Sequence, residues 1–190
     1  MKTIPAICFL LILTACGGKN KYRKAADEMA SNAPEPTNMN AGKREYTIAI
    51  PEGWTAEHRS ANGVDYYFLL APKTKDDPNT NINVTTEFMQ HLSLEDYEAK
   101  SIESVKKYIP TSAITAQGDI DANGLNGKWY SYTIEPQGIK ASLVNYVFPK
   151  DGIAYTITAG TQTKDAARYR NTFDSVARSL RFTRSNLLKK

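Results

Sequence analysis

Lys164-Asp-Ala-Ala-Arg-Tyr-Arg-Asn-Thr-Phe-Asp-Ser-Val-Ala-Arg-Ser-Leu180 is the segment that constrains the architecture most, because it predicts a helix with one apolar side. Its cations lie off a single apolar stripe that recurs at helical spacing. The stripe consists of Ala166, Tyr169, Phe173, Val176, Ala177 and Leu180. Such a helix must cover that side with another element, and strand patterns precede it in the chain. We therefore expect residues 164–180 to pack on a β-sheet.

Four strand-like segments lead up to this helix. They cover residues 113–121, 127–135, 139–148 and 152–159. The links between them are turn sequences, namely Asn123-Gly124, Pro136-Gln137-Gly138 and Lys150-Asp151-Gly152. Because short links join antiparallel neighbours, these strands should form a meander.

The preceding part of the domain predicts three strands and a helix. Alternating apolar residues indicate strands over 45–50, 64–71 and 82–88. Ser93 suits an N-cap and Pro110 a stop, so residues 94–109 should be an amphipathic helix. Arg181-Phe182-Thr183 is expected to add a short closing strand. The fold class is therefore α+β, with an antiparallel β-sheet flanked by helices.

The N-terminal segment has the pattern of an export signal. The apolar run over residues 4–13 is shorter than the roughly 20 residues that span a bilayer. The sequence that closes it, Leu13-Thr14-Ala15-Cys16, resembles the lipobox of bacterial lipoproteins. The resemblance implies a diacylglyceryl group on the Cys16 thiol and removal of residues 1–15. The alternative is that Cys16 ends an ordinary signal or a buried helix.

The pattern divides the chain into a signal (1–15), a lipidated Cys with a tether (16–44), a domain (45–184) and a basic tail (185–190). The tether is poor in bulky apolar residues and is expected to be mobile, with a reach of ~30 Å. Its basic cluster, at Lys19, Lys21, Arg23 and Lys24, could contact anionic lipid or be a solvated linker.

Composition excludes several classes of function. The chain has 24 basic and 20 acidic residues, and so small an excess does not indicate a nucleic-acid partner. Cys8 leaves with the signal, so Cys16 is the remaining cysteine and no disulfide or thiolate zinc site is expected. No cofactor is expected either.

Motifs for metal binding and catalysis are incomplete. Asp119-x-Asp121-x-Asn123-Gly124 matches the first half of an EF-hand loop, but the position of the bidentate Glu is Tyr130. A hairpin turn is the preferred interpretation, and a weak calcium site is the alternative. His58 and His91 each lie alone in a predicted loop, without a metal-binding motif. The sequence lacks a Gly-x-Ser-x-Gly elbow, so no catalytic residue is assigned.

Aromatic residues crowd the predicted meander. They are Trp129, Tyr130, Tyr132, Tyr146, Phe148 and Tyr155. One alternating face must be core, and the other is either covered by a second helix layer or exposed for binding. If that face is exposed, Trp54 and Trp129 are the candidates for contact with a partner.

Residues 45–183 resemble the PsbP-like family of photosystem II extrinsic subunits and their bacterial relatives. The resemblance is carried by Tyr46-Thr-Ile-Ala-Ile-Pro-Glu-Gly-Trp54, Ile82-Asn-Val84, Asn123-Gly124 and Phe173-Asp-Ser-Val-Ala-Arg-Ser-Leu-Arg-Phe182. It implies an α-β-α sandwich that binds or assembles partners, usually without catalysis. It does not imply a photosynthetic role.

The leading functional hypothesis is an envelope lipoprotein, held to the membrane through Cys16, that binds a protein partner without catalysis. The alternatives are an envelope hydrolase with a scattered active site and a carrier of a small ligand or metal. Gly17 stands where an Asp would favour retention at the inner membrane, so the expected location is the outer membrane, facing the periplasm.

Overall fold

The computed structural model describes residues 46–61, 64–77 and 79–183. The predicted signal, the lipidated Cys16, the tether and the basic tail lie outside these residues. The expected division of the chain around them therefore stays a prediction.

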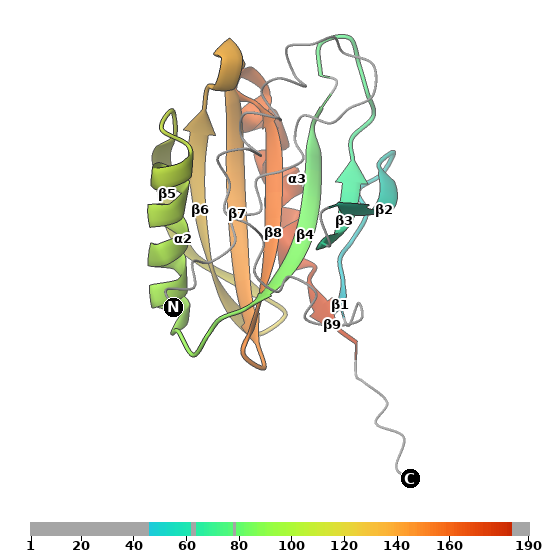
Figure 1. Ribbon diagram of the computed structural model, residues 1–190. Helices are drawn as coiled ribbons and strands as arrows, with labels where there is room; N and C mark the ends of the chain where they lie inside the picture. Colours follow the sequence, from blue (N-terminus) through green and yellow to red (C-terminus); the bar gives the residue numbers. More distant parts are fainter. Residues whose placement is uncertain (1–45, 62–63, 78, 184–190) are drawn as a thin grey trace.

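Seven strands form one antiparallel sheet in the order β2-β3-β4-β8-β7-β6-β5 (Figure 1). They are β2 (Thr55–Ala61), β3 (Val64–Leu70), β4 (Asn81–Phe88), β5 (Ala113–Ala122), β6 (Leu125–Ile134), β7 (Ala141–Lys150) and β8 (Ile153–Gln162). The predicted meander is confirmed, because β5 to β8 follow one another in space as they do in sequence. Pairing of β4 with β8 joins the meander to the first three strands.

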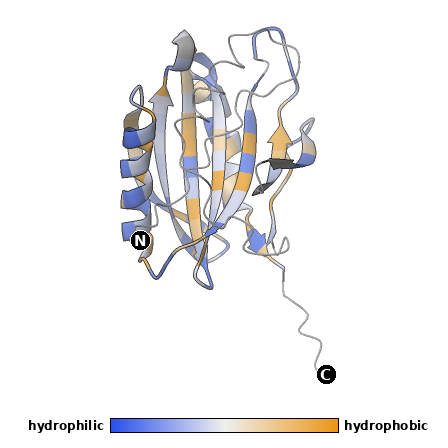
Figure 2. Ribbon diagram, viewed as in Figure 1, coloured by the Kyte–Doolittle hydropathy of each residue, from blue (hydrophilic) through white to orange (hydrophobic). Residues whose placement is uncertain are grey.

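Two helices cover opposite faces of this sheet, as expected for the α-β-α architecture. They are α2 (Leu94–Tyr108) and α3 (Ala166–Arg178), accompanied by the short 3-10 helices η1 (Pro136–Gly138) and η2 (Thr163–Asp165). Along β7 the side chains alternate: Leu143 packs with α2, and Tyr146 packs with α3. Both faces of β7 are therefore buried, and Figure 2 shows bands of hydrophobic residues along β4 and β7.

The predicted limits of α2 agree with its capping chemistry. Ser93 accepts a hydrogen bond from the Asp96 amide at 3.0 Å, which satisfies one of the backbone donors at the start of the helix. Tyr97 and Val105 are buried against the sheet. The helix ends at Tyr108, two residues before Pro110.

The prediction of a strand over residues 45–50 is largely wrong. Only β1 (Tyr46–Thr47) forms, and it pairs with β9 (Arg181–Phe182) in a separate two-stranded sheet. Ala49 instead donates its amide to the Ser179 hydroxyl at 2.8 Å, and Ile50 is 50% exposed. The predicted closing strand at the end of the domain therefore exists, but it pairs with the beginning of the domain.

The sequence did not predict strand β2. His58 therefore lies in a strand and not in the expected loop. The sequence of this strand, Thr-Ala-Glu-His-Arg-Ser-Ala, lacks a run of bulky apolar residues. Strand β2 lies at the edge of the sheet, where pairing with β3 through the backbone suffices to form a strand.

Candidate functional site

Trp129, one of the two tryptophans expected to contact a partner, lies on the α3 face of β6. Its ring is partly buried against the main core cluster. The guanidinium of Arg170, on α3, lies over the ring at 4.2 Å from its centroid. This is the geometry of a cation–π contact, which favours Arg over an aromatic face.

Arg170 is held in this position by a polar network between α3 and β7. Its Nε donates to both carboxylate oxygens of Asp174 at 3.0 Å. The Tyr146 hydroxyl donates to Asp174 Oδ1 at 2.5 Å. Burial of Tyr146 and its hydrogen bond to Asp174 raise the pKa of the phenol, so it stays a donor at neutral pH. The network therefore holds the guanidinium over the Trp129 ring.

Trp54, the other candidate, packs against a different part of α3. Trp54 is the last residue of a turn, in which its backbone amide donates a hydrogen bond to the Pro51 carbonyl at 3.1 Å. Its ring meets Tyr169 edge to face, with centroids 6.1 Å apart. The Tyr169 hydroxyl donates to buried Asp77 at 2.6 Å. Burial and this hydrogen bond raise the pKa of Tyr169.

The structure does not bring the two tryptophans into one patch. They contact consecutive residues of α3, and consecutive helical residues point about 100° apart. Trp54 also precedes edge strand β2, whereas Trp129 lies on β6, towards the other edge of the sheet. The two rings therefore flank α3, and both pack partly into the core that α3 forms with the sheet.

The side of α3 next to Trp129 presents the Arg170 guanidinium to solvent. Arg170 keeps 34% of its side chain accessible, and Arg178, further along the helix, is exposed. Arg168 lies over the Tyr169 ring, on the flank of α3 that Trp54 contacts. Within the described residues, the hydrogen bonds of Arg170 use Nε, which leaves its two Nη groups for an incoming carboxylate. We name this surface, formed by Trp129, Arg170 and Asp174, the Arg170 platform.

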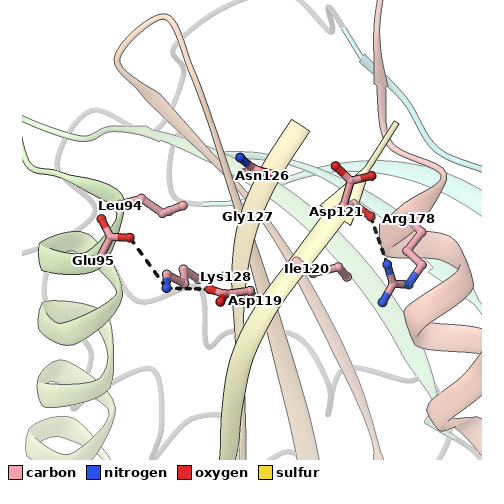
Figure 3. A pocket seen from close by; sticks show the side chains of 9 residues that line it. All are labelled: Leu94, Glu95, Asp119, Ile120, Asp121, Asn126, Gly127, Lys128 and Arg178. Carbon is pink, nitrogen blue, oxygen red and sulfur yellow. Dashed lines mark hydrogen bonds and ion pairs between the residues drawn. The ribbon is translucent and has the colours of Figure 1, made fainter. Parts of the chain in front are cut away.

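A cavity of about 510 Å³ lies beside the β5–β6 hairpin, between the start of α2 and the end of α3 (Figure 3). In it, the Lys128 ammonium binds Asp119 at 2.6 Å and Glu95 at 3.6 Å. The hydrogen bond to Asp119 raises the pKa of Lys128. Burial raises the pKa of nearby Glu98. Two carboxylates pair with the lysine here, whereas Arg170 is paired with one carboxylate through Nε and keeps its Nη groups for a partner.

The EF-hand-like residues form a hairpin, in agreement with the preferred interpretation. Asn123 and Gly124 occupy the two turn positions with φ values of 56° and 84°, which is typical of a type I′ turn. The side-chain amide of Asn123 donates to the carbonyls of Arg178 at 3.0 Å and Leu180 at 2.9 Å. The side chains considered as calcium ligands therefore make hydrogen bonds to the end of α3 and within the turn that joins β5 to β6.

The histidines are placed apart. His58 lies on β2 with its ring 4.9 Å from that of Tyr67, and His91 is exposed in the turn between β4 and α2. In the described part of the chain, no group of three or more His, Cys, Asp or Glu residues is arranged to hold a metal ion. Over the same residues, no helix combines the length and apolar character needed to cross a membrane.

Sequence reasoning did not assign Arg170, Asp174 or Tyr146 to a site. The i,i+4 spacing of Arg170 and Asp174 is the one local signal that could have indicated their ion pair. Contact with Trp129 and Tyr146 depends on how α3 lies on the sheet, which the spacing does not contain.

No protein-family model and no curated protein matches this sequence. Solved structures share its fold. PA94 of Pseudomonas aeruginosa, a protein of unknown function, superposes with a TM-score of 0.55 and 13% identity, over 65% of this chain and 94% of that chain. LpqN of Mycobacterium tuberculosis, involved in cell envelope biogenesis, has a TM-score of 0.50 and 10% identity, over 75% of this chain and 87% of that chain.

A third match is CyanoP, the cyanobacterial PsbP of Synechocystis sp. PCC 6803, with a TM-score of 0.49 and 14% identity, over 77% of this chain and 98% of that chain. PA94 and LpqN share the α-β-α architecture described above, and identities this low show the fold alone. Structure and comparisons thus agree that the described part of the chain has an α+β fold, in which a large antiparallel sheet carries two helices.

Proposed function

We propose that this protein is an envelope lipoprotein, anchored through Cys16, whose domain binds a protein partner without catalysis. The observation that carries the proposal is the Arg170 platform, in which a guanidinium stacks on Trp129 at 4.2 Å and is held by Asp174. Tryptophan and arginine are enriched among the residues that dominate binding energy at protein interfaces. LpqN, which shares the fold, is involved in cell envelope biogenesis, and this is consistent with the envelope location that the Cys16 motif predicts.

The partner surface should be acidic. The Nη groups of Arg170 can donate two parallel hydrogen bonds to a carboxylate, and exposed Arg178 adds positive charge further along α3. The stack on Trp129 holds the guanidinium in place before the partner arrives, so less conformational entropy is lost on binding.

Substitution of Arg170 tests the binding surface. A tagged protein, cross-linked in the envelope and purified in detergent, should capture a stoichiometric partner. With that partner purified, Arg170→Ala should weaken binding by about tenfold or more, because the carboxylate of the partner loses its bidentate donor. Arg170→Lys should recover part of the loss, since lysine keeps the charge but not the planar fork.

Lys107 offers a matched control, because its ammonium also lies over an aromatic ring, that of Tyr108, at 5.0 Å, but on α2. Lys107→Ala should leave binding unchanged. Equal loss in both variants, or a large fall in the thermal stability of Arg170→Ala, would contradict the proposal.

The anchor is tested separately. Two or three acyl chains hold a protein durably at a bilayer, so the protein should fractionate with membranes and partition into detergent. Cys16→Ser should release it to the soluble fraction. A variant that still sediments fully with membranes would refute lipidation at Cys16 and leave the Arg170 platform as a separate question.

A further inference from the structure

Both ends of the described chain lie at one end of the sheet, the lower end in Figure 1. Tyr46 pairs with Phe182, and the Lys150 ammonium lies 5.3 Å from the centroid of the Phe182 ring. The turn between β4 and α2 is beside them, because the Met89 amide donates to the Gly152 carbonyl at 2.9 Å. We name this region the anchor end, since the chain leads from Tyr46 towards Cys16.

The large hydrophobic side chains that are exposed in the described part of the chain are Ile50, at 50%, and Phe88, at 47%. Both lie at the anchor end. Ala49 is fixed beside Ser179, just after α3, which places Ile50 there. Phe88 pairs with Ile153 at the end of β4. Single exposed apolar residues are common on protein surfaces, so their shared location is what requires an explanation.

Phe88 borders a cavity of about 620 Å³ at this end. The apolar part of its wall consists of Phe88, Met89, Leu92, Leu94 and Pro149. Gln90 and His91, on the rim, have φ values of 53° and 64°, a left-handed conformation that non-glycine residues seldom adopt. Strained backbone of this kind concentrates at functional positions, and here it lies directly beside an exposed phenylalanine.

Charge does not dominate this surface. Lys150 is paired with Asp151 at 3.1 Å, and Asp151 also lines the cavity. Arg178 and Arg181 are exposed nearby. A surface of this composition should contact uncharged lipid through its apolar residues, and the two exposed arginines should strengthen the contact where headgroups are anionic.

We infer that the anchor end is a lipid-contacting surface, in which Ile50 and Phe88 enter the interface of the bilayer and the cavity beside Phe88 takes part of an acyl chain. The inference rests on the proposed lipid anchor at Cys16. A tether that keeps the domain near the bilayer raises the effective concentration of lipid, so a contact too weak to bind alone is occupied.

Environment-sensitive labels test this orientation in the full lipidated protein. Ile50→Cys and Phe88→Cys are each labelled with a nitrobenzoxadiazole dye and reconstituted in phosphatidylcholine vesicles. Lys106→Cys is the control, because Lys106 is exposed near the end of α2 that lies away from the anchor end. The labels at positions 50 and 88 should shift their emission to the blue and lose intensity with brominated lipids, and neither effect should change with added salt.

Each alternative outcome has a separate meaning. If the protein floats with the vesicles but the labels at 50 and 88 behave like the label at 106, the lipid-contacting surface is refuted and the anchor stands. If the protein does not float with the vesicles, the anchor fails and this inference fails with it. If the labels respond to an added envelope protein and not to lipid, the anchor end is a protein-binding surface and the inference is overturned.

Discussion

Asp77 shows how single polar residues stabilise the α3 side of the molecule. The residue is buried, with 3% of its surface exposed. It accepts hydrogen bonds from the Thr80 amide at 3.2 Å, the Thr80 hydroxyl at 2.7 Å and the Tyr169 hydroxyl at 2.6 Å. A buried carboxylate is tolerated only when its oxygens are satisfied in this way. Asp77 thus connects the loop after β3 to α3.

Asp77→Ala should lower the free energy of unfolding by about 2–4 kcal/mol, because the donors on Thr80 and Tyr169 would stay buried without their acceptor. Urea denaturation measures the change. Neighbouring Asp76 is exposed, so Asp76→Ala should stay within about 0.5 kcal/mol of the wild type. Similar losses in both variants would show that the carboxylate at position 77 has no special role.

The Tyr146–Asp174 hydrogen bond should make stability depend on alkaline pH. Below about pH 10 the phenol is protonated in both the folded and the unfolded chain. Above that pH the unfolded chain loses the proton, whereas burial and Asp174 raise the pKa of Tyr146 in the folded chain. The unfolded state then binds fewer protons, so the free energy of unfolding falls as pH rises.

Tyr146→Phe removes this contribution, and its stability should fall less steeply than that of the wild type between about pH 9 and about pH 11. Urea denaturation at a series of pH values measures both slopes. Parallel curves would mean that Tyr146 ionises alike in the folded and unfolded chains.

At the scale of elements, the β5–β6 hairpin supports the end of α3. Asn123 supplies a left-handed turn residue, and its amide satisfies the carbonyls of Arg178 and Leu180. The last carbonyls of a helix have no partner within the helix, so this side chain acts as a cap supplied from another element. The turn and the helix therefore stabilise each other.

Two substitutions separate the roles of Asn123. Asn123→Gly keeps the backbone conformation but removes the cap, and it should cost about 1–2 kcal/mol. Asn123→Ala also adds the strain of a left-handed alanine, about 1–2 kcal/mol more. Thermal unfolding of the two variants measures the difference. If both variants match the wild type, the cap contributes nothing to stability.

At the scale of the whole molecule, stability should be concentrated in the centre of the sheet. Strands β4, β8 and β7 are paired on both sides and lie between the helix layers, whereas β1 and β9 form a two-stranded pair of their own. Short, isolated pairs are weak because few contacts offset the entropy of ordering them.

Hydrogen exchange followed by mass spectrometry should therefore find the slowest exchange in β7 and β8 and much faster exchange in β1 and β9. Edge strand β2 should be intermediate. If β9 were protected as well as β8, the two-stranded pair would have to be part of the main cooperative unit.

The amino-acid sequence by itself determined the elements whose signals are local. The limits of α2, the presence of α3, the hairpin at Asn123-Gly124 and the meander from β5 to β8 follow from periodicity, capping and turn residues. The helix predicted over 164–180 is shorter, at Ala166–Arg178, because its first residues form η2. These signals record which side of an element is buried and where the backbone must turn. The identity of the anchoring residue, Cys16, is likewise a sequence prediction, and it lies outside the described residues.

Only the tertiary structure decided which distant segments meet. It paired Tyr46 with Phe182, turned the segment around His58 into an edge strand, and placed Arg170 over Trp129. These contacts leave no periodic trace, because they depend on how whole layers pack and not on the preferences of neighbouring residues. For that reason the sequence could indicate Trp129 as a candidate, but only the structure shows which residues contact its ring.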